Sequence, residues 1–312
     1  MTEHYVTLFN SAFLPQGLAL HASLIRHGGD FQLWVIALDQ TTELRLNDLG
    51  LANVTVVPLQ AVESPSLLAV KPTRSIAEYC WTLTPFTPDV VFERTADATR
   101  VTYIDADMWL VADPTPLFSE LTDNHANALI TPHAYSNRYL SENKYGEFCV
   151  QFMPFTRNGS EVIRRTWQNQ CLDWCYSTPD ATRFGDQKYL DAWPATYGDN
   201  VRILSHPEWT QAPWNVQRFA SSDAITFHFH RLRLVTGNRA LLGLYAIPRA
   251  HIDRMYRPYL QDLRQAVDTL SHMGVPFAPQ SELPRGIEYW KSLAEFRLHN
   301  VTHPTARRAL NY

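Results

Sequence analysis

The sequence lacks the features that mark several large classes of protein. It has only four cysteines in 312 residues, no continuous apolar run of membrane-spanning length, and a formal net charge of -4. No membrane-spanning helix is therefore predicted, and the charge gives no sign of a nucleic-acid or anionic-membrane surface. The opening residues MTEHYVTLFN contain no basic segment followed by an apolar one. We therefore predict no signal peptide.

The cysteines form no recognisable metal or disulfide framework. Cys171 and Cys175 are the only close pair, in CLDWC, and their spacing of one helical turn is more typical of core packing than of zinc binding. Scattered cysteines without a secretion signal predict a protein of the reducing cytoplasm. We expect structural roles for the cysteines, with one exception at Cys149.

Glycine-rich phosphate loops are also absent, since neither G-x-G-x-x-G nor G-x-x-x-x-G-K occurs. A bound nucleotide would therefore need a metal ion to neutralise its phosphates. What the chain does have is 45% hydrophobic and 19% charged residues, the composition of a globular protein with a large core.

Apolar segments alternate with amphipathic ones through the first third of the chain, which predicts an α/β fold with a mostly parallel central sheet flanked by helices. In such sheets ligands bind at the carboxyl ends of the strands. The predicted strands are residues 5–11, 31–39, 53–59 and 100–110, and the predicted helices are 17–28, 41–51 and 75–93, the last broken at Pro85 and Pro88.

The second half predicts a strong amphipathic helix over 160–176, a turn and short helix over 184–193, and an alternating strand over 224–235. The tail, 285–310, reads as helical and partly basic. A seam near residues 210 to 225 is an alternative boundary. We predict one catalytic domain over 1–235, with a C-terminal helical extension over 236–312 packed on it.

YIDADMW, residues 103 to 109, places Asp105 and Asp107 one residue apart at the end of a buried strand. In an extended chain these side chains share one face, about 7 Å apart. Two such carboxylates raise each other's pKa unless a cation lies between them, and magnesium is commonly held by carboxylates and substrate phosphates. The alternative is a turn in which the aspartates cap the next element, closed by Asp113 and Pro114.

FHFH, residues 227 to 230, alternates two histidines with two phenylalanines, so His228 and His230 are expected on one strand face. An imidazole added to carboxylates favours manganese, which accepts mixed nitrogen and oxygen ligands. A histidine buried for packing alone is the alternative.

Two further segments carry candidate binding residues. Asp186 and Gln187 lie at a predicted helix start in GDQKYL, where Asp186 could instead be an N-cap. Arg74 precedes a helix in KPTRSIAEY and could reach a phosphate. The alternative for Arg74 is a surface pair with Glu78, four residues later.

In order and spacing, these motifs resemble a GT-A fold glycosyltransferase, more closely the bacterial relatives of the glycogenin-like and lipopolysaccharide galactosyltransferases. The resemblance covers residues 5 to about 235. It rests on LPQGLAL, RSIAEYCWTLTP, YIDADMW with DP after it, FGDQKYLDAWP, HP followed by APWN over 206–215, and FHFH.

The resemblance implies a hexosyl- or pentosyltransferase that uses a nucleotide-diphosphate sugar, most often UDP-linked, with Mn²⁺ or Mg²⁺. Asp105 would contact the ribose and the metal, and Asp107 would bind the metal directly. His228 matches the third metal ligand, with His230 as the alternative. The remaining matches are Asp186 and Gln187 beside the donor sugar and the reacting centre, Phe9 and Asn10 near the base, and Arg74 facing the nucleotide.

The chain departs from the family pattern around the sugar and the pyrophosphate. Relatives commonly carry Asn-x-Gly where this sequence has Cys149 and Gln151, and glycine where it has Arg231. Cys149, Gln151 and Arg231 are therefore candidate donor-binding residues, and the donor sugar is open. Arg231 would add charge for the diphosphate, and a surface role is its alternative.

The implied mechanism retains configuration, because the departing phosphate takes the acceptor proton. Inversion would need a carboxylate base, for which Asp186 is the candidate. Two other functions stay open: a sugar-1-phosphate nucleotidyltransferase, whose usual glycine-rich N-terminal loop is missing, and an inactive nucleotide-sugar-binding homologue.

The acceptor is open among a glycan, a lipid-linked glycan, a protein and a nucleic acid. The C-terminal stretch is basic and aromatic, which permits a peripheral membrane contact. Packing of its aromatic side chains on the core is the alternative. The residues concerned are Tyr289, Trp290, Lys291, Arg297, Arg307 and Arg308.

Overall fold

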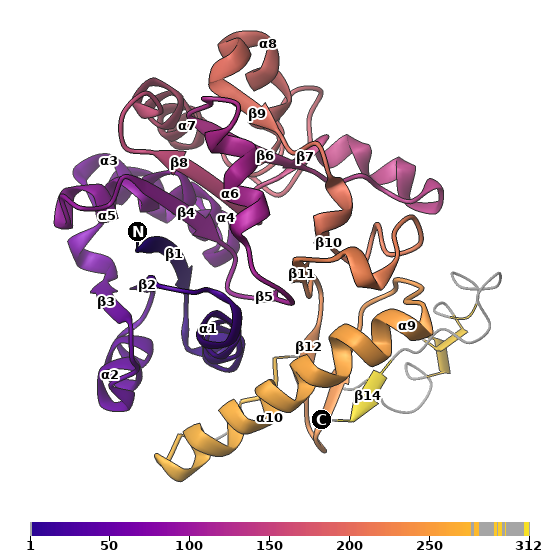
Figure 1. The fold of residues 1–312 in the computed structure, drawn as a ribbon. Coiled ribbons are helices and arrows are strands. Elements are labelled where there is room, and N and C mark those ends of the chain that lie inside the picture. Colours follow the sequence, from indigo (N-terminus) through magenta and orange to yellow (C-terminus); the bar gives the residue numbers. More distant parts are fainter. Residues whose placement is uncertain are drawn as a thin grey trace.

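The computed structural model describes residues 2–275, 278–280, 290–291, 293–294, 297 and 309–311. It has an eight-stranded central sheet in the order β3-β2-β1-β4-β8-β6-β7, with β9 paired to β6 (Figure 1). The first four strands in this order are parallel, as predicted. The strands of this sheet are β1 (Glu3–Phe9), β2 (Phe31–Ala37), β3 (Val54–Pro58), β4 (Arg100–Ile104), β6 (Ala128–Pro132), β7 (Phe148–Cys149), β8 (Phe152–Thr156) and β9 (Val201–Ile203).

The helices begin and end at the signals that the sequence carries. Asp39 caps α2 by accepting from the Thr42 amide at 2.8 Å, and Ser75 with Glu78 forms a capping box on α4. A 3₁₀ turn at Thr84–Phe86 separates α4 from α5, where the prolines predicted a break. The helices are α1 (Leu14–His27), α2 (Gln40–Leu49), α3 (Pro65–Val70), α4 (Ile76–Leu83), α5 (Thr87–Arg94), α6 (Thr115–Thr122), α7 (Glu161–Asp173), α8 (Trp193–Tyr197), α9 (Arg249–His251) and α10 (Arg257–His272), with a π-helical turn at Ile252–Tyr256.

Two small sheets accompany the central one. The first has the order β10-β11-β5 and the second β12-β13-β14. The predicted single strand over 224–235 is wrong, because it divides into β11 and β12 with a turn between them. The strands are β5 (Met108–Leu110), β10 (Thr210–Gln211), β11 (Thr226–His228), β12 (Arg233–Val235), β13 (Arg239–Leu241) and β14 (Ala309–Asn311).

The central sheet is buried on both faces. Alternate residues of β1 enter different apolar clusters, with Val6 and Leu8 on one face and Tyr5 and Phe9 on the other. This is the burial expected of a parallel sheet covered by helices. Cys171 and Cys175 belong to the first cluster, and all four cysteines are free, in agreement with a packing role for the pair.

The C-terminal part packs on the first helix and on the small sheet. α10 runs beside α1 (Figure 1), and Asp262 binds both Arg26, at 2.5 Å, and the Trp109 indole nitrogen, at 2.7 Å. The extension is not wholly helical, because it also contributes β13 and β14. The helix predicted over 285–310 is wrong at Ala309 and Leu310, which lie in β14.

Several C-terminal expectations lie outside the described residues, namely those for Tyr289, Arg307 and Arg308. Trp290 is described and is 67% exposed. The domain division at residue 235 stays a prediction.

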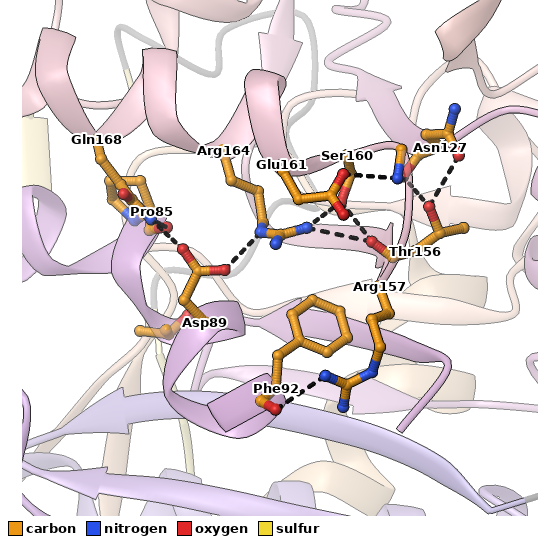
Figure 2. Close-up of polar contacts among 12 residues, drawn as sticks. Pro85, Asp89, Phe92, Asn127, Thr156, Arg157, Ser160, Glu161, Arg164 and Gln168 are labelled. Carbon is orange, nitrogen blue, oxygen red and sulfur yellow. Dashed lines mark hydrogen bonds and ion pairs between the residues drawn. The ribbon is translucent and has the colours of Figure 1, made fainter. Parts of the chain in front are cut away.

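The buried side chain of Arg164 connects α7 to α5 and to β8 (Figure 2). The Arg164 guanidinium donates to Asp89 Oδ1 on α5 at 2.7 Å and to the Thr156 carbonyl at the end of β8 at 3.1 Å. Gln168 donates to the second Asp89 oxygen at 2.6 Å. The helix fixed in this way carries Trp167, whose indole donates to the Asp186 carbonyl at 2.7 Å. The network therefore positions a candidate site residue.

Candidate active site

Asp105 and Asp107 lie in a tight turn, not in an extended strand as predicted. β4 ends at Ile104 and β5 begins at Met108, whose amide donates to the Asp105 carbonyl at 3.1 Å. β5 leaves the central sheet and pairs antiparallel with β11, with Met108 opposite His228. The turn between two sheets therefore brings both carboxylates to the imidazole.

Asp105, Asp107 and His228 form a group whose potential ligand atoms all lie within 4.8 Å of one another. The His228 Nε2 atom is 3.1 Å from Asp107 Oδ1 and 3.7 Å from Asp105 Oδ2. Two carboxylate oxygens and one imidazole nitrogen fit a divalent cation, and the mixed donor set suits Mn²⁺ better than Mg²⁺. The residues present therefore fit the metal that the fold implies.

Burial and the charges of this group shift the pKa values of all three residues. Burial favours neutral Asp107, but the imidazole beside it outweighs burial and lowers the Asp107 pKa to about 2. Burial raises the Asp105 pKa, and repulsion from Asp107 adds to the rise against the attraction of His228. Burial alone would lower the His228 pKa, but the two carboxylates raise it well above its ordinary value. A cation at this place would replace the imidazolium charge.

His230 is not a member of this group. β11 ends at His228, and the chain then turns through Arg231, which adopts a left-handed φ of 61°. The rings of His228 and His230 have centroids 5.6 Å apart. Burial and the His228 charge lower the His230 pKa to about 3, so this imidazole is neutral. The geometry thus favours His228 as the ligand.

A cavity of about 700 Å³ opens beside the aspartate turn, at the carboxyl ends of β1 and β4. It is lined by every candidate catalytic, donor-binding and metal-binding residue except Arg74 and Gln151. Those lining it are Phe9, Asn10, Asp105, Asp107, Cys149, Asp186, Gln187, His228, His230 and Arg231.

Phe9 and Asn10 end the first strand at the cavity wall. α1 can approach Phe9 closely because residue 17 is glycine: a Cβ there would lie 2.3 Å from the Phe9 ring. The Asn10 Oδ1 atom is buried without a hydrogen-bond partner among the described residues. Such an orphaned acceptor is available to a ligand donor.

Asp186 is not an N-cap, since the 3₁₀ helix that follows at Lys188–Ala192 has no side-chain cap. It follows Gly185, whose left-handed φ of 50° turns the chain beside the Trp81 ring. The Asp186 carboxyl is buried, and its Oδ2 has no partner within the described structure. Burial and the nearby Asp105 raise the Asp186 pKa to about 8, so it is largely protonated at neutral pH. Gln187 Nε2 donates to the Tyr145 carbonyl at 2.9 Å.

Arg74 lies away from the cavity. Its guanidinium stacks 3.8 Å above the Tyr176 ring and donates to the Leu172 carbonyl at 3.3 Å. The alternative pair with Glu78 does not form either, because that carboxylate accepts from Ser75 and Ser177. Asp113, by contrast, closes a turn as expected, accepting from the Thr115 amide at 2.8 Å.

Sequence reasoning missed several cavity residues. Tyr103 donates to Asp105 Oδ1 at 2.7 Å, and its position two residues before Asp105 was a usable signal. Arg233 alternates with Arg231 in HRLRL and also lines the cavity. The aromatic residues that complete the cavity lining had no sequence motif to mark them, because they come from segments far apart in the chain. They are Trp81, His133, Tyr135, Tyr145, Phe184, Trp214 and Tyr245.

Comparison with known proteins finds relatives without a described activity. The Bacillus subtilis (strain 168) protein YfnD is 28% identical over 295 residues, covering 89% of this chain and 94% of YfnD. YfnF of the same strain is 28% identical over 292 residues, covering 88% and 93%. Both are described as uncharacterized proteins. No family model matches the chain.

Comparison with solved structures finds glycosyltransferases. The galactosyltransferase LgtC, in complex with donor and acceptor sugar analogs, aligns with a TM-score of 0.52 at 14% identity, covering 84% of this chain and 95% of LgtC. The apo-form glycosyltransferase GlyE of Streptococcus pneumoniae TIGR4 aligns with a TM-score of 0.52 at 14% identity, covering 90% of this chain and 66% of GlyE. At these identities the likeness shows the fold: the chain has the GT-A glycosyltransferase fold that its motifs predicted.

Within the described part of the chain, no helix is both long enough and apolar enough to cross a membrane.

Proposed function

We propose that the chain is a metal-dependent glycosyltransferase that transfers a sugar from a nucleotide-diphosphate donor. The observation that carries the proposal is the convergence of Asp105, Asp107 and His228 in the lining of a large cavity in a GT-A fold. A divalent cation bound there would supply electrostatic stabilisation to the departing diphosphate. The mixed oxygen and nitrogen donors favour Mn²⁺ over Mg²⁺.

The donor is assigned as a UDP-sugar by resemblance and by the residues that line the cavity. Phe9 and the orphaned Asn10 oxygen offer an aromatic face and an acceptor to a base at one end. Arg231 and Arg233 line the same cavity as the aspartate turn and would add positive charge for the diphosphate. Asp186 and Gln187 are assigned to the donor sugar and the reacting centre.

Retention of configuration is the favoured outcome. The Asp186 pKa of about 8 leaves its carboxyl largely protonated at neutral pH, which makes it a poor base. The departing phosphate would then take the acceptor proton. Glu142 is the other carboxylate in the cavity lining besides the candidate metal ligands, so inversion would depend on Glu142 or Asp186.

The acceptor is assigned as a glycan. The cavity wall includes aromatic side chains, among them Tyr135, Tyr145 and Trp214. Such amphipathic rings pack on the apolar faces of sugars while hydrogen bonding to hydroxyl groups. A protein, a lipid carrier or a nucleic acid would need contacts beyond this wall.

Calorimetric titration of UDP tests the proposal, with Mn²⁺ and then with a chelator, on the wild type and on Asp107→Ala. We expect binding that needs both the metal and Asp107. Hydrolysis of UDP-sugars then separates an enzyme from an inactive binding homologue, and a requirement for a nucleoside triphosphate would identify a nucleotidyltransferase. Failure of UDP, GDP, CDP and dTDP to bind under every condition would overturn the transferase assignment.

A further inference from the structure

Gln151 does not line the cavity, but it contacts the group formed by Asp105, Asp107 and His228. Its side chain is fully buried, and its Oε1 atom is 2.8 Å from the His228 Nδ1 atom. Its main-chain carbonyl accepts from the Asp105 amide at 3.1 Å. One residue that does not line the cavity therefore contacts two members of the group. The sequence-based expectation that it binds the donor finds no support in this placement.

The chemistry of His228 requires a partner of this kind. An imidazole binds a metal through an unprotonated nitrogen, and the Nε2 atom is the one that faces Asp107 and Asp105. Nδ1 must then carry the proton, and a buried N–H needs an acceptor. The Gln151 amide oxygen supplies it in the arrangement found.

We infer that Gln151 is a positioning residue that holds His228 in the Nδ1-protonated tautomer, with Nε2 free for a divalent cation. The inference rests on the metal site of the proposed function. It is a feature of this chain's own sequence, because the transferases that it resembles commonly carry glycine at this position and so have no side chain to reach the imidazole. Partners of this kind affect metal affinity by about 10- to 100-fold.

The molecule contains a matched control pair. Gln211 is also fully buried, and its Oε1 atom is 2.9 Å from the Nε2 atom of the buried His251. Gln211 and His251 do not line the cavity. Substitution of either glutamine by methionine removes a buried Gln–His hydrogen bond with little change of volume, but only the bond of Gln151 leads to the group of Asp105, Asp107 and His228. Gln211→Met also removes the Nε2 hydrogen bonds to the Glu208 and Ala220 carbonyls, so it is the more disruptive of the two substitutions for packing.

The test measures Mn²⁺ affinity without nucleotide, by calorimetry, for the wild type, Gln151→Met and Gln211→Met. We expect about a 10- to 100-fold loss for Gln151→Met and less than a twofold change for Gln211→Met. Gln151→Glu keeps an acceptor for Nδ1 and is expected to restore affinity to within a few-fold of the wild type. Thermal unfolding of each variant establishes that it is folded. Should Gln151→Met not fold, Gln151→Asn withdraws the amide by one methylene and is expected to weaken binding in its place.

Wild-type affinity in folded Gln151→Met, or in Gln151→Asn if Gln151→Met does not fold, would overturn the inference. An equal loss in Gln151→Met and Gln211→Met would also overturn it, because it would reveal a general effect on packing. A wild-type chain that binds no Mn²⁺ would overturn the metal site itself and this inference with it. The two failures are distinguishable, since the first leaves wild-type binding intact.

Discussion

Two buried glutamine–histidine pairs, Gln151–His228 and Gln211–His251, show what makes a histidine a site residue in this chain. Both histidines are buried, and each donates a ring N–H to a glutamine side-chain oxygen. They differ in what faces the other ring nitrogen. The Nε2 atom of His228 faces two carboxylates, whereas the Nδ1 atom of His251 has no partner within the described residues.

The surroundings shift the two histidine pKa values in opposite directions. Burial lowers the pKa of His251 to about 4, and no charge opposes it. Burial acts on His228 in the same direction, but the carboxylates of the aspartate turn reverse the result and raise its pKa. Burial and a glutamine partner therefore do not define a site. The acidic turn that β5 brings to β11 is what defines it.

The largest expected effect comes from removing the acidic partner. Asp107→Asn keeps the shape of the side chain but removes its charge, and we expect a loss of Mn²⁺ affinity of at least about 100-fold, on the order of 3 kcal/mol. Calorimetry with Mn²⁺ measures it. Asp113→Asn is the control, because its carboxylate closes an exposed turn. A comparable loss in the control would show that the aspartate turn has no special role.

Substitution of His228 by glutamine should give the next largest loss of Mn²⁺ affinity. His228→Gln removes a proposed ligand, and we expect a loss of Mn²⁺ affinity of roughly 10- to 100-fold or more. His251→Gln is expected to leave that affinity unchanged and to lower the free energy of unfolding by about 1–2 kcal/mol, through one altered buried hydrogen bond. Metal titration and urea unfolding of both variants separate the two roles. Loss of metal binding in His251→Gln would break the contrast.

The free energy of unfolding should depend on pH through His251. Native His251 stays neutral down to pH 4, whereas in the unfolded chain it is protonated below about pH 6.5. Its contribution is therefore present above pH 6.5 and is lost as the pH falls toward 4. Between about pH 7.5 and about pH 5 the wild type should lose on the order of 1–2 kcal/mol more than His251→Gln. Urea unfolding at the two pH values checks this, and parallel losses in the two proteins would contradict it.

The smallest expected effect is on UDP binding and compares two arginines. Arg231 lines the cavity, as His228 does, whereas Arg74 lies outside it, as His251 does. Arg231→Ala should weaken Mn²⁺-dependent UDP binding by about 3- to 10-fold, as expected for one charge-assisted contact. Arg74→Ala should change it less than twofold, because the guanidinium lies on Tyr176 away from the cavity. UDP titration of both variants measures this. Equal losses of UDP affinity in the two variants would indicate that Arg74 also belongs to the binding site.

Local patterns were enough to predict the first half of the fold. β1 to β4 and the helices α1, α2, α4 and α5 follow from apolar runs, caps and prolines, which act within a few residues of themselves, whereas α3 was not predicted. The same patterns failed at FHFHRLRL. Alternation predicted one strand there, but the chain turns after His228 through a left-handed Arg231. That turn depends on packing against Tyr245 and Tyr259, which are supplied by later segments.

The sequence by itself determined the residue types of the site: two aspartates one residue apart, a histidine in an aromatic run, and no glycine loop for phosphate. Only the tertiary structure decided which of these residues meet. The pairing of β5 with β11 selected His228 over His230, and stacking on Tyr176 holds Arg74 away from the cavity. It also put Gln151 behind the imidazole and not beside the donor. The physical reason is that covalent spacing fixes neighbours only within a strand or a helical turn, whereas a site assembled from β1, β4, β11 and the Asp186 loop depends on long-range packing.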